Sequence, residues 1–486
     1  MKPLIAFLDV TKAYDKAWMQ AILYTLHKSG IKGQDWRIIK RLNENLTAKI
    51  DTKYGPTRSI KIRDSIRQGG ILAVPQHANM MDEITKEISK NPHNFIKCGN
   101  IKIPGCLLWM DDVLLMHTEP ASLQRMLDTT HKIASKYRIK FGTEKSKIIQ
   151  VNTKQNLMIN FKLGGQNMEN TDTYKYLGIT FNNKGNMSDH IKNLEGKAEA
   201  ATQAIINISA NNTLKKLQLP TTWKLHKTCL LPMITYSTES LNLTKKELTK
   251  LEGIRTTALK RYLITPKSTP DIAILSETAS LPIQTKIEEK TIMYYHKKRS
   301  QNNHTFLEET KWHTNLQNIL KKHDITTEQL TNKPTKQIRT MVKHKLKHSH
   351  MKQLEMRNQN RSKTKNILLQ RNKQNILTKP KYMNTLSRNK CSAIFKYKSK
   401  MIDVKANYPG RYKDNRCRFC GEENETQEHI FRECKELTDL TNKIDTEQLN
   451  ANDNMNYLNE AKIIQQIIHK LEENKPPRAK NKDPKT

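Results

Sequence analysis

Two adjacent aspartates, Asp111 and Asp112, lie between two apolar runs in the stretch LLWMDDVLLM, residues 107–116. Neighbouring carboxylates repel each other, and apolar flanks disfavour their charged form. The pattern predicts a strand, a turn and a second strand with both acids at the tip, although Asp-Asp is not a preferred two-residue turn. A departure from good turn chemistry that places charge at one point indicates a functional site. We expect a cation to hold these side chains.

A third acid, Asp9, follows the apolar run LIAFL and is predicted at the C-terminal end of a strand. If the two apolar segments pair in one sheet, Asp9 and Asp111 can meet at one of its ends. Carboxylates in that position bind Mg²⁺, and a pair of such ions clamps the attacking and leaving oxygens of a phosphoryl displacement. Each segment alone has a simpler explanation, the first as a helix N-cap and the second as a surface turn. The combination predicts a magnesium site.

Three of the seven cysteines cluster with a histidine in CRFCGEENETQEHIFREC. Cys417, Cys420, His429 and Cys434 have the spacing C-x2-C-x8-H-x4-C, which predicts one structural Zn²⁺ ion with four protein ligands. A coincidental grouping of cysteines is the alternative. The remaining cysteines are scattered, and we expect them to be reduced and mostly packed; they are Cys98, Cys106, Cys229 and Cys391.

The chain of 486 residues has 85 Lys plus Arg against 47 Asp plus Glu, a formal charge of +38. This excess predicts a polyanionic partner, most simply nucleic acid, with a merely soluble basic protein as the alternative. No apolar run reaches the roughly 20 residues that span a bilayer. The first fifteen residues meet Asp9 before a secretory signal can form. We therefore expect no membrane partner, with a basic protein at a membrane surface as the unsupported alternative, and the location within the cell, cytoplasmic and/or nuclear, stays open.

Apolar periodicity changes along the chain. Before residue 185 short strands alternate with helical patterns, which is typical of an α+β fold. Amphipathic helices follow, and one is predicted to begin at Thr244, where Glu247 can complete a capping box. Residues 341–400 carry 17 Lys plus Arg and one acid, which predicts a surface that tracks a phosphate backbone, a solvated face being the alternative.

Five stretches resemble, in order and spacing, the palm motifs of reverse transcriptases, and their local wording is similar to that of non-LTR (LINE-type) retrotransposon polymerases. They are FLDVTKAYDKAW, DSIRQGGIL, LLWMDDVLLM, GTEKSKII and YKYLGITF. Five ordered motifs are far more specific than any one of them. The resemblance implies an RNA-directed DNA polymerase of a transposable element, which extends a DNA primer on an RNA template with dNTPs and two Mg²⁺ ions. The cysteine cluster is similar to the zinc knuckles that follow the polymerase in such elements.

The resemblance also implies roles for single residues where they match. It assigns metal ligation to Asp9, Asp111 and Asp112, contact with the pyrophosphate leaving group to Lys145, contact with the nucleotide and template to Tyr14, Gln68, Gly69, Trp109 and Met110, and the primer grip to Tyr176, Leu177 and Gly178. The ring of Tyr14 would leave no room for a 2′-hydroxyl group, and Gly69 would let the backbone approach closely.

The sequence departs from the family pattern at several positions. Trp109 stands where the family usually has Tyr, and Met110 where LINE-type enzymes often have Ala. Ala73 and Val74 replace the common Ser-Pro, so the start of the following helix is less firmly specified. Because the family's fingers precede the motif of Asp9, we expect an N-terminally truncated polymerase with its fingers mostly missing and its catalysis impaired.

The implied fold is α+β, with a palm made of an antiparallel sheet and helices on one face, then a helical thumb and C-terminal region, then a small zinc-binding module. We predict a partial reverse transcriptase palm at 1–184, a helical thumb-like region at 185–300, a basic helical nucleic-acid-binding region at 301–409, a CCHC zinc knuckle at 410–436, and a C-terminal helix with a disordered basic tail at 437–486.

Three hypotheses on function stay open. The first is a reverse transcriptase that binds RNA template, DNA primer or RNA–DNA hybrid, and dNTPs, and works within a retroelement ribonucleoprotein. The second is a catalytically inactive retroelement fragment that binds RNA or DNA through its basic region and zinc knuckle. The third is a product of a degraded element without function. The intact Asp9, Asp111 and Asp112 favour the first over the third, and missing fingers would favour the second.

Overall fold

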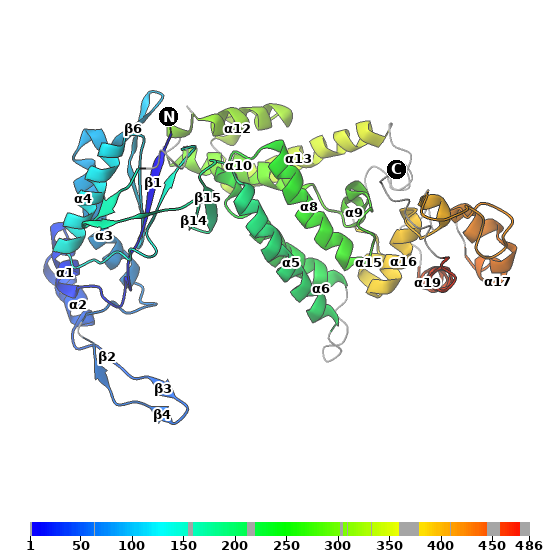
Figure 1. Ribbon diagram of the computed structural model, residues 1–486, viewed down its shortest axis with the longest axis horizontal. Helices are drawn as coiled ribbons and strands as arrows, with labels where there is room; N and C mark the ends of the chain where they lie inside the picture. Colours follow the sequence, from blue (N-terminus) through cyan, green and yellow to red (C-terminus); the bar gives the residue numbers. More distant parts are fainter. Residues whose placement is uncertain are drawn as a thin grey trace, which may run out of the picture. The chain divides into compact units, whose positions relative to one another are not determined.

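The computed structural model describes residues 2–62, 64–153, 159–210, 219–301, 305–308, 310–331, 333–358, 379–408, 410–444 and 457–476. The chain divides into two compact units, Met1–His190 and Ile191–Thr486, and each is described by itself (Figure 1). Within the described ranges, no helix combines the length and the apolar character that a membrane crossing requires.

Unit 1 is built on a five-stranded sheet in the order β13-β10-β1-β9-β8. Neighbouring strands are antiparallel, except that β10 and β13 are parallel. The strands are β1 (Leu4–Asp9), β8 (Cys106–Trp109), β9 (Asp112–His117), β10 (Lys147–Gln150) and β13 (Glu169–Asn170). The structure therefore confirms the mixed helix and strand pattern that was expected before residue 185.

Side chains alternate across the central strand β1 and so separate two apolar clusters. Leu4, Ala6 and Leu8 belong to the larger cluster, which includes residues of the helices α1 (Met19–Lys28), α3 (Ala73–Ser89) and α4 (Pro120–Lys136). Phe7 belongs to the smaller cluster on the opposite face. Helices thus cover one face of the sheet and leave the other face to a hairpin.

The remaining elements of unit 1 are short. They are α2 (Gly33–Asn43) and the strand pairs β2 (Thr47–Ala48) with β5 (Ile60–Lys61), β3 (Asp51–Thr52) with β4 (Gly55–Pro56), β6 (Phe95–Cys98) with β7 (Ile101–Pro104), β11 (Lys162–Leu163) with β12 (Gln166–Asn167), and β14 (Thr173–Tyr176) with β15 (Ile179–Asn182). The ribbon from β2 to β5 projects from the body of unit 1 as an exposed arm (Figure 1). This arm was not predicted from the sequence.

The described part of unit 2 is helical, as predicted from residue 185 onward. Its helices are α5 (Ser188–Ala210), which begins at the end of unit 1, α6 (Leu219–Leu225), α7 (Leu231–Ile234), α8 (Lys245–Tyr262), α9 (Asp271–Glu277), α10 (Ile283–Ser300), α11 (Thr305–Glu308), α12 (Lys311–Lys322), α13 (Thr335–Asn358), α15 (Tyr382–Thr385), α16 (Arg388–Lys398), α17 (Thr438–Thr441) and α19 (Leu458–Glu473). Thr244 caps α8, and the predicted capping box with Glu247 is present in both directions. Helix α16 packs against α19.

Two sequence predictions concern residues outside the described ranges. They are the central part of the basic segment, residues 359–378, and the basic tail after residue 476. The five predicted regions keep the status of predictions.

Candidate active site and metal centre

The three predicted metal-binding aspartates lie together at one end of the sheet of unit 1. In the antiparallel pairing of β1 with β9, Asp9 is directly opposite Asp112. In the hairpin of β8 and β9, Trp109 is opposite Asp112, so Met110 and Asp111 form the turn. The strand–turn–strand prediction is therefore confirmed, but the register places Asp112, rather than Asp111, opposite Asp9. Met110 adopts the left-handed conformation, with φ of 59°, which is unfavourable for a side chain of its size.

Negative charge exceeds positive charge at this end of the sheet. Burial, followed by the charges of Asp111 and Asp9, raises the pKa of the Asp112 carboxyl above its ordinary value. Lys145 brings Nζ to 3.7 Å from Oδ2 of Asp9. The three carboxylates lie close enough for Asp9 and Asp111 to raise the pKa of Asp112, and a divalent cation bound among them would favour their ionised forms. Asp9, Asp111 and Asp112 are therefore the residues that could hold Mg²⁺.

Tyr14 lies in the turn after β1 and stacks on the ring of His77, with the two ring centroids 5.2 Å apart. His77 is buried on α3, where burial lowers its pKa and the charge of Asp111 acts in the opposite direction. His77 was not among the site residues predicted from the sequence. The signal that could have found it is its spacing with Ala73 and Met80, which places a polar ring on the buried face of the helix.

Backbone and side-chain hydrogen bonds join the turn of Tyr14 to the predicted Gln-Gly segment. The carbonyl of Tyr14 accepts a hydrogen bond from the N–H of Ile66 at 2.9 Å. Gln68 donates through Nε2 to Oδ1 of Asp15 at 3.2 Å. Gly69 has φ of 78°, a conformation that explains the glycine. The structure thus places Gln68 and Gly69 beside the turn that carries Tyr14.

The predicted primer-grip residues form the turn between β14 and β15. Leu177 and Gly178 both have positive φ, as a tight two-residue hairpin requires. Tyr176 packs against Phe7 on the face of the sheet opposite the helices. Burial, and next the charge of Asp112, raises the pKa of Tyr176 to about 12. The hairpin therefore lies close enough to Asp112 for the charge of that carboxylate to raise the pKa of Tyr176.

The predicted zinc ligands converge in unit 2. Ligand atoms of Cys417, Cys420, His429 and Cys434 all lie within 4.8 Å of one another. Two sulfur atoms that share one tetrahedral Zn²⁺ at about 2.3 Å lie about 3.8 Å apart, and Sγ of Cys417 and Sγ of Cys434 are 3.8 Å apart. Sγ of Cys420 and Nε2 of His429 are 3.3 Å apart. The donor set and its spacing therefore fit one tetrahedral metal ion.

Local backbone geometry brings these four side chains together. Gly421, with φ of 72°, closes the turn after Cys420 and donates its N–H to the carbonyl of Cys417 at 3.0 Å. His429 begins a π-helical turn that ends at Glu433, and the N–H of Cys434 donates to the carbonyl of His429. A tight turn and one helical turn therefore bring the four ligands together.

The scattered cysteines only partly match their prediction. Cys106 and Cys391 are buried, whereas Cys229 is exposed on the surface. Cys229, in the π-helical segment His226–Leu230, is thus the exception among the three scattered cysteines whose burial is described.

A buried ion pair supports the loop of residues 417–434 that carries the four predicted zinc ligands, which is called the metal loop below. Arg418, between the first two cysteines, forms a two-pronged pair with Glu425, and both side chains are almost fully buried. Glu425 also accepts hydrogen bonds from the N–H groups of Lys405 and Arg418. Arg418 in turn donates to the carbonyls of Asp403 and Leu471, so one guanidinium group joins the metal loop, the 402–408 segment and α19.

Comparisons with known proteins agree with this geometry. Residues 1–181 match the family described as reverse transcriptase (RNA-dependent DNA polymerase). This part of the chain is a reverse transcriptase domain.

Two curated relatives place that domain among polymerases of non-LTR elements. The chain is 23% identical over 260 residues to the RNA-directed DNA polymerase from mobile element jockey of Drosophila melanogaster, covering 53% of this chain and 28% of that protein. It is 25% identical over 211 residues to the retrovirus-related Pol polyprotein from type-1 retrotransposable element R2 of Popillia japonica, covering 39% of this chain and 34% of that protein. The chain is thus homologous to both and spans about a third of their length.

Among solved structures, telomerase from Candida albicans in complex with a TWJ fragment of telomeric RNA matches with a TM-score of 0.30 and 11% identity. The match covers 68% of this chain and 48% of that one.

Proposed function

We propose that this chain is an RNA-directed DNA polymerase of a non-LTR retrotransposon, which extends a DNA primer on an RNA template. The observation that carries the proposal is the placement of Asp9 opposite Asp112, with Asp111 in the adjoining turn, inside a reverse transcriptase domain. In the reaction, the 3′-hydroxyl of the primer forms a bond to the α-phosphorus of a dNTP, and the bond to pyrophosphate breaks.

Each residue near the carboxylates has a role in this proposal. When bound to the three aspartates, two Mg²⁺ ions would polarise the reacting phosphate and neutralise the charge that develops on it. Lys145, close to Asp9, supplies a positive charge and a proton for the leaving pyrophosphate. Tyr14, held against His77, excludes a 2′-hydroxyl group from the sugar site. The turn at Leu177 and Gly178 supports the primer end, and Gln68 with Gly69 faces the nucleotide and template.

The decisive experiment is primer extension on an RNA template with Mg²⁺, comparing the parent chain with the double variant Asp111→Ala, Asp112→Ala. We expect the parent to extend the primer and the double variant to lose on the order of 10³-fold in rate, because the remaining carboxylate cannot hold the cations. The variant Asp128→Ala removes an exposed acid of α4 and serves as the control that keeps the parental rate. Extension that survives in the double variant would overturn the assignment.

A second candidate is binding of RNA or DNA without chemistry, which the formal charge of +38 favours. The same assay separates the two functions. No extension by the parent, with RNA binding retained, would support the second candidate over the first.

For unit 2 we propose one structural Zn²⁺ ion on the cysteine–histidine group, in a knuckle that binds nucleic acid. Elemental analysis of protein purified without chelator is expected to find one zinc per chain, and none in the variant Cys417→Ser, Cys434→Ser. Cys229→Ser removes an exposed thiol outside the group and is the matched control. Equal zinc content in the parent and the double variant would contradict the site.

A further inference from the structure

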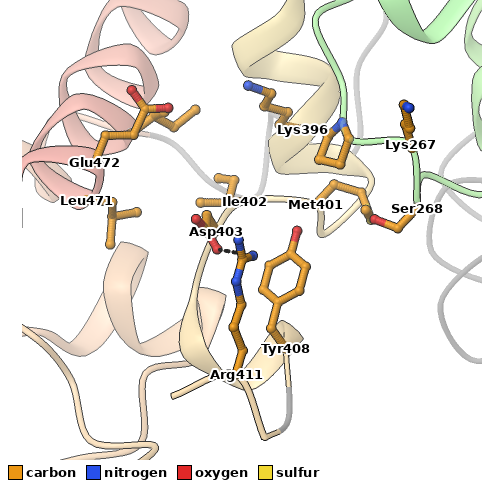
Figure 2. A pocket seen from close by; sticks show the side chains of 12 residues that line it. Lys267, Ser268, Lys396, Met401, Ile402, Asp403, Tyr408, Arg411, Leu471 and Glu472 are labelled. Carbon is orange, nitrogen blue, oxygen red and sulfur yellow. Dashed lines mark ion pairs between the residues drawn. The ribbon is translucent and has the colours of Figure 1, made fainter. Parts of the chain in front are cut away.

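A cavity of about 490 Å³ in unit 2 is lined by residues that have no part in either site above. Three segments form it: residues 266–268 after α8, the end of α16 with the following loop, and α19. Figure 2 shows Tyr408 and Arg411 side by side, with the side chains of Met401 and Ile402 nearby. The volume lies in the range of sites for small organic molecules, which run from about 300 to 1,000 Å³.

One part of the cavity wall is apolar and aromatic. Met401, Ile402 and Leu471 contribute aliphatic surface. Tyr408 is half-buried, and the guanidinium group of Arg411 lies 4.9 Å from its ring centroid. Such a wall holds a flat ring by stacking and apolar contact.

The acid at the centre of the cavity is already neutralised. Asp403 forms ion pairs with Arg411 at 3.7 Å and with Lys475, and it accepts a hydrogen bond from the hydroxyl of Tyr412 at 3.2 Å. Burial alone would raise the pKa of Asp403, but Lys475, Arg411 and Tyr412 outweigh it, and the pKa is lowered. Asp403 therefore stays ionised and paired, and it does not repel an anion as a free carboxylate would.

Lysines supply the positive charge that remains. In the described part of the chain, Nζ of Lys396 has no hydrogen-bond or ion-pair partner, although the side chain is half-buried. Burial lowers its pKa, and the charges of Glu472 and Asp403 act in the opposite direction. Lys267 lies exposed at the rim, and Glu472 is exposed on α19. A partly buried amine without a partner gains most from a charged acceptor such as a phosphate oxygen.

The metal loop fixes the walls of the cavity. Arg418 donates hydrogen bonds to the carbonyls of Asp403 and Leu471, which lie on different sides of it. Because the guanidinium group is itself held by the buried Glu425, the two walls keep their spacing before any ligand arrives. A preformed site binds without the cost of ordering its walls.

We propose that this cavity binds one unpaired nucleotide of a single-stranded nucleic acid, with the base against Tyr408 and the apolar wall and the phosphate against Lys396 and Lys267. The inference rests on the nucleic-acid function proposed above, which supplies the strand. A nucleic-acid strand and a free nucleotide both offer a nucleoside phosphate, so a free nucleotide is the alternative ligand.

The test measures binding of a fluorescently labelled 12-nucleotide oligouridine RNA by anisotropy, without primer or dNTPs, so its outcome does not depend on polymerisation. The variant Lys267→Met, Lys396→Met keeps the aliphatic stems and removes both amines. We expect it to bind about 10-fold more weakly and to lower the slope of log K against log[salt] by about 1.4, because each single-strand phosphate contact contributes about 0.7.

The matched control is Lys390→Met, Lys470→Met, which removes the same charge from α16 and α19 at positions that do not line the cavity. The control is expected to bind clearly more tightly than the pocket variant, whose folding is checked by circular dichroism. An equal loss in both variants would overturn the proposal, because the effect would then be one of net charge.

A second measurement locates the nucleotide. RNA carrying 4-thiouridine is expected to cross-link to the 401–411 peptide in the parent and not in Tyr408→Leu. Cross-links confined to other segments would overturn the site. Competition by 1 mM uridine monophosphate as strong as that of the 12-mer would show that free nucleotide, rather than a strand, is the ligand.

Discussion

The ionised carboxylate of Asp112 faces the charges of Asp9 and Asp111 at the end of the sheet. Its pKa is raised in the folded state, first by burial and then by these neighbours. A raised pKa means that the carboxyl stabilises the fold below its ordinary pKa, and that this contribution is lost as pH rises through the raised pKa. At neutral pH the charge of Asp112 therefore lowers the stability of the fold, although the proposed binding of a cation needs the same charge.

We accordingly predict that Asp112→Asn stabilises the metal-free chain at pH 7 by roughly 0.5–1 kcal/mol, a small figure because the side chain is partly solvated. The gain should fade toward pH 3, where the parental carboxyl is protonated. Thermal unfolding at the two pH values, with and without Mg²⁺, measures both effects, and Mg²⁺ should stabilise the parent more than the variant. A variant that is less stable than the parent at pH 7 would contradict the prediction. Asp128→Asn is the control.

The ring of His77 stacks on the ring of Tyr14 and supports its position. We predict that His77→Ala lets Tyr14 move and raises the insertion of ribonucleotides relative to deoxyribonucleotides about 10-fold. His77→Phe keeps a ring under Tyr14 and should restore the parental ratio, and among the described residues the Nε2 atom of His77 has no hydrogen-bond partner to lose. Equal discrimination in all three proteins, measured by single-nucleotide insertion, would remove His77 from this role.

Local patterns in the sequence predicted the acidic hairpin but not its register. The apolar flanks of Asp111 and Asp112 were sufficient for two strands and a turn, since that information lies within ten residues. The two-residue turn puts Met110 in the left-handed conformation, which no propensity of methionine predicts. The opposition of Asp9 and Asp112 depends on the register of β1 against β9, two strands that lie far apart in the chain. The stacking of Tyr14 on His77 joins segments far apart in the chain, and a single sequence does not record such contacts.

At the scale of elements, the buried pair of Arg418 and Glu425 connects the metal loop to α19. We predict that Glu425→Gln destabilises unit 2 by about 3–5 kcal/mol, because it leaves a buried guanidinium group without its counter-charge. Urea unfolding measures the loss.

The neighbouring variant Glu428→Gln is the matched control. Glu428 pairs with Lys400 on the surface at 2.9 Å, and such exposed pairs contribute under about 1 kcal/mol. Similar losses in the two variants would show that burial of the Arg418 pair has no energetic role.

Some of these features are predicted by the sequence and others are not. The capping box of α8 needs only Thr244 and Glu247, so the sequence shows it directly. The knuckle ligands likewise follow from spacing alone. Arg418 carries no such signal, because Asp403, Glu425 and Leu471 reach it from three separate segments.

At the scale of the whole molecule, the charge of +38 predicts binding that weakens steeply with salt. Deletion of residues 341–400 would not test this, because it removes α16, whose Ile394 and Phe395 are buried in the core. Substitution on α13 is cleaner. Its apolar face is buried at Ile338, Val342 and Leu346, and Lys336, Lys343 and Lys347 are exposed to solvent.

We predict that Lys336→Gln, Lys347→Gln flattens the salt dependence of RNA binding by up to about 1.4 units of slope. Lys132→Gln, Lys136→Gln removes the same charge from the exposed side of α4 in unit 1 and should change the slope less. Anisotropy titrations between about 50 and 300 mM salt, roughly a sixfold range, measure both slopes. A larger change in the α4 variant would exclude α13 as the principal contact.

The bridge from Arg418 to the carbonyl of Leu471 has a consequence for synthesis of the chain. The ribosome releases the four metal-binding side chains well before it releases α19, so the knuckle can collect its ion while the guanidinium group of Arg418 still lacks one acceptor. The module reaches its final hydrogen bonding only when the last helix emerges. A nascent chain stopped short of α19 would therefore leave a buried N–H group of Arg418 without the acceptor that Leu471 provides.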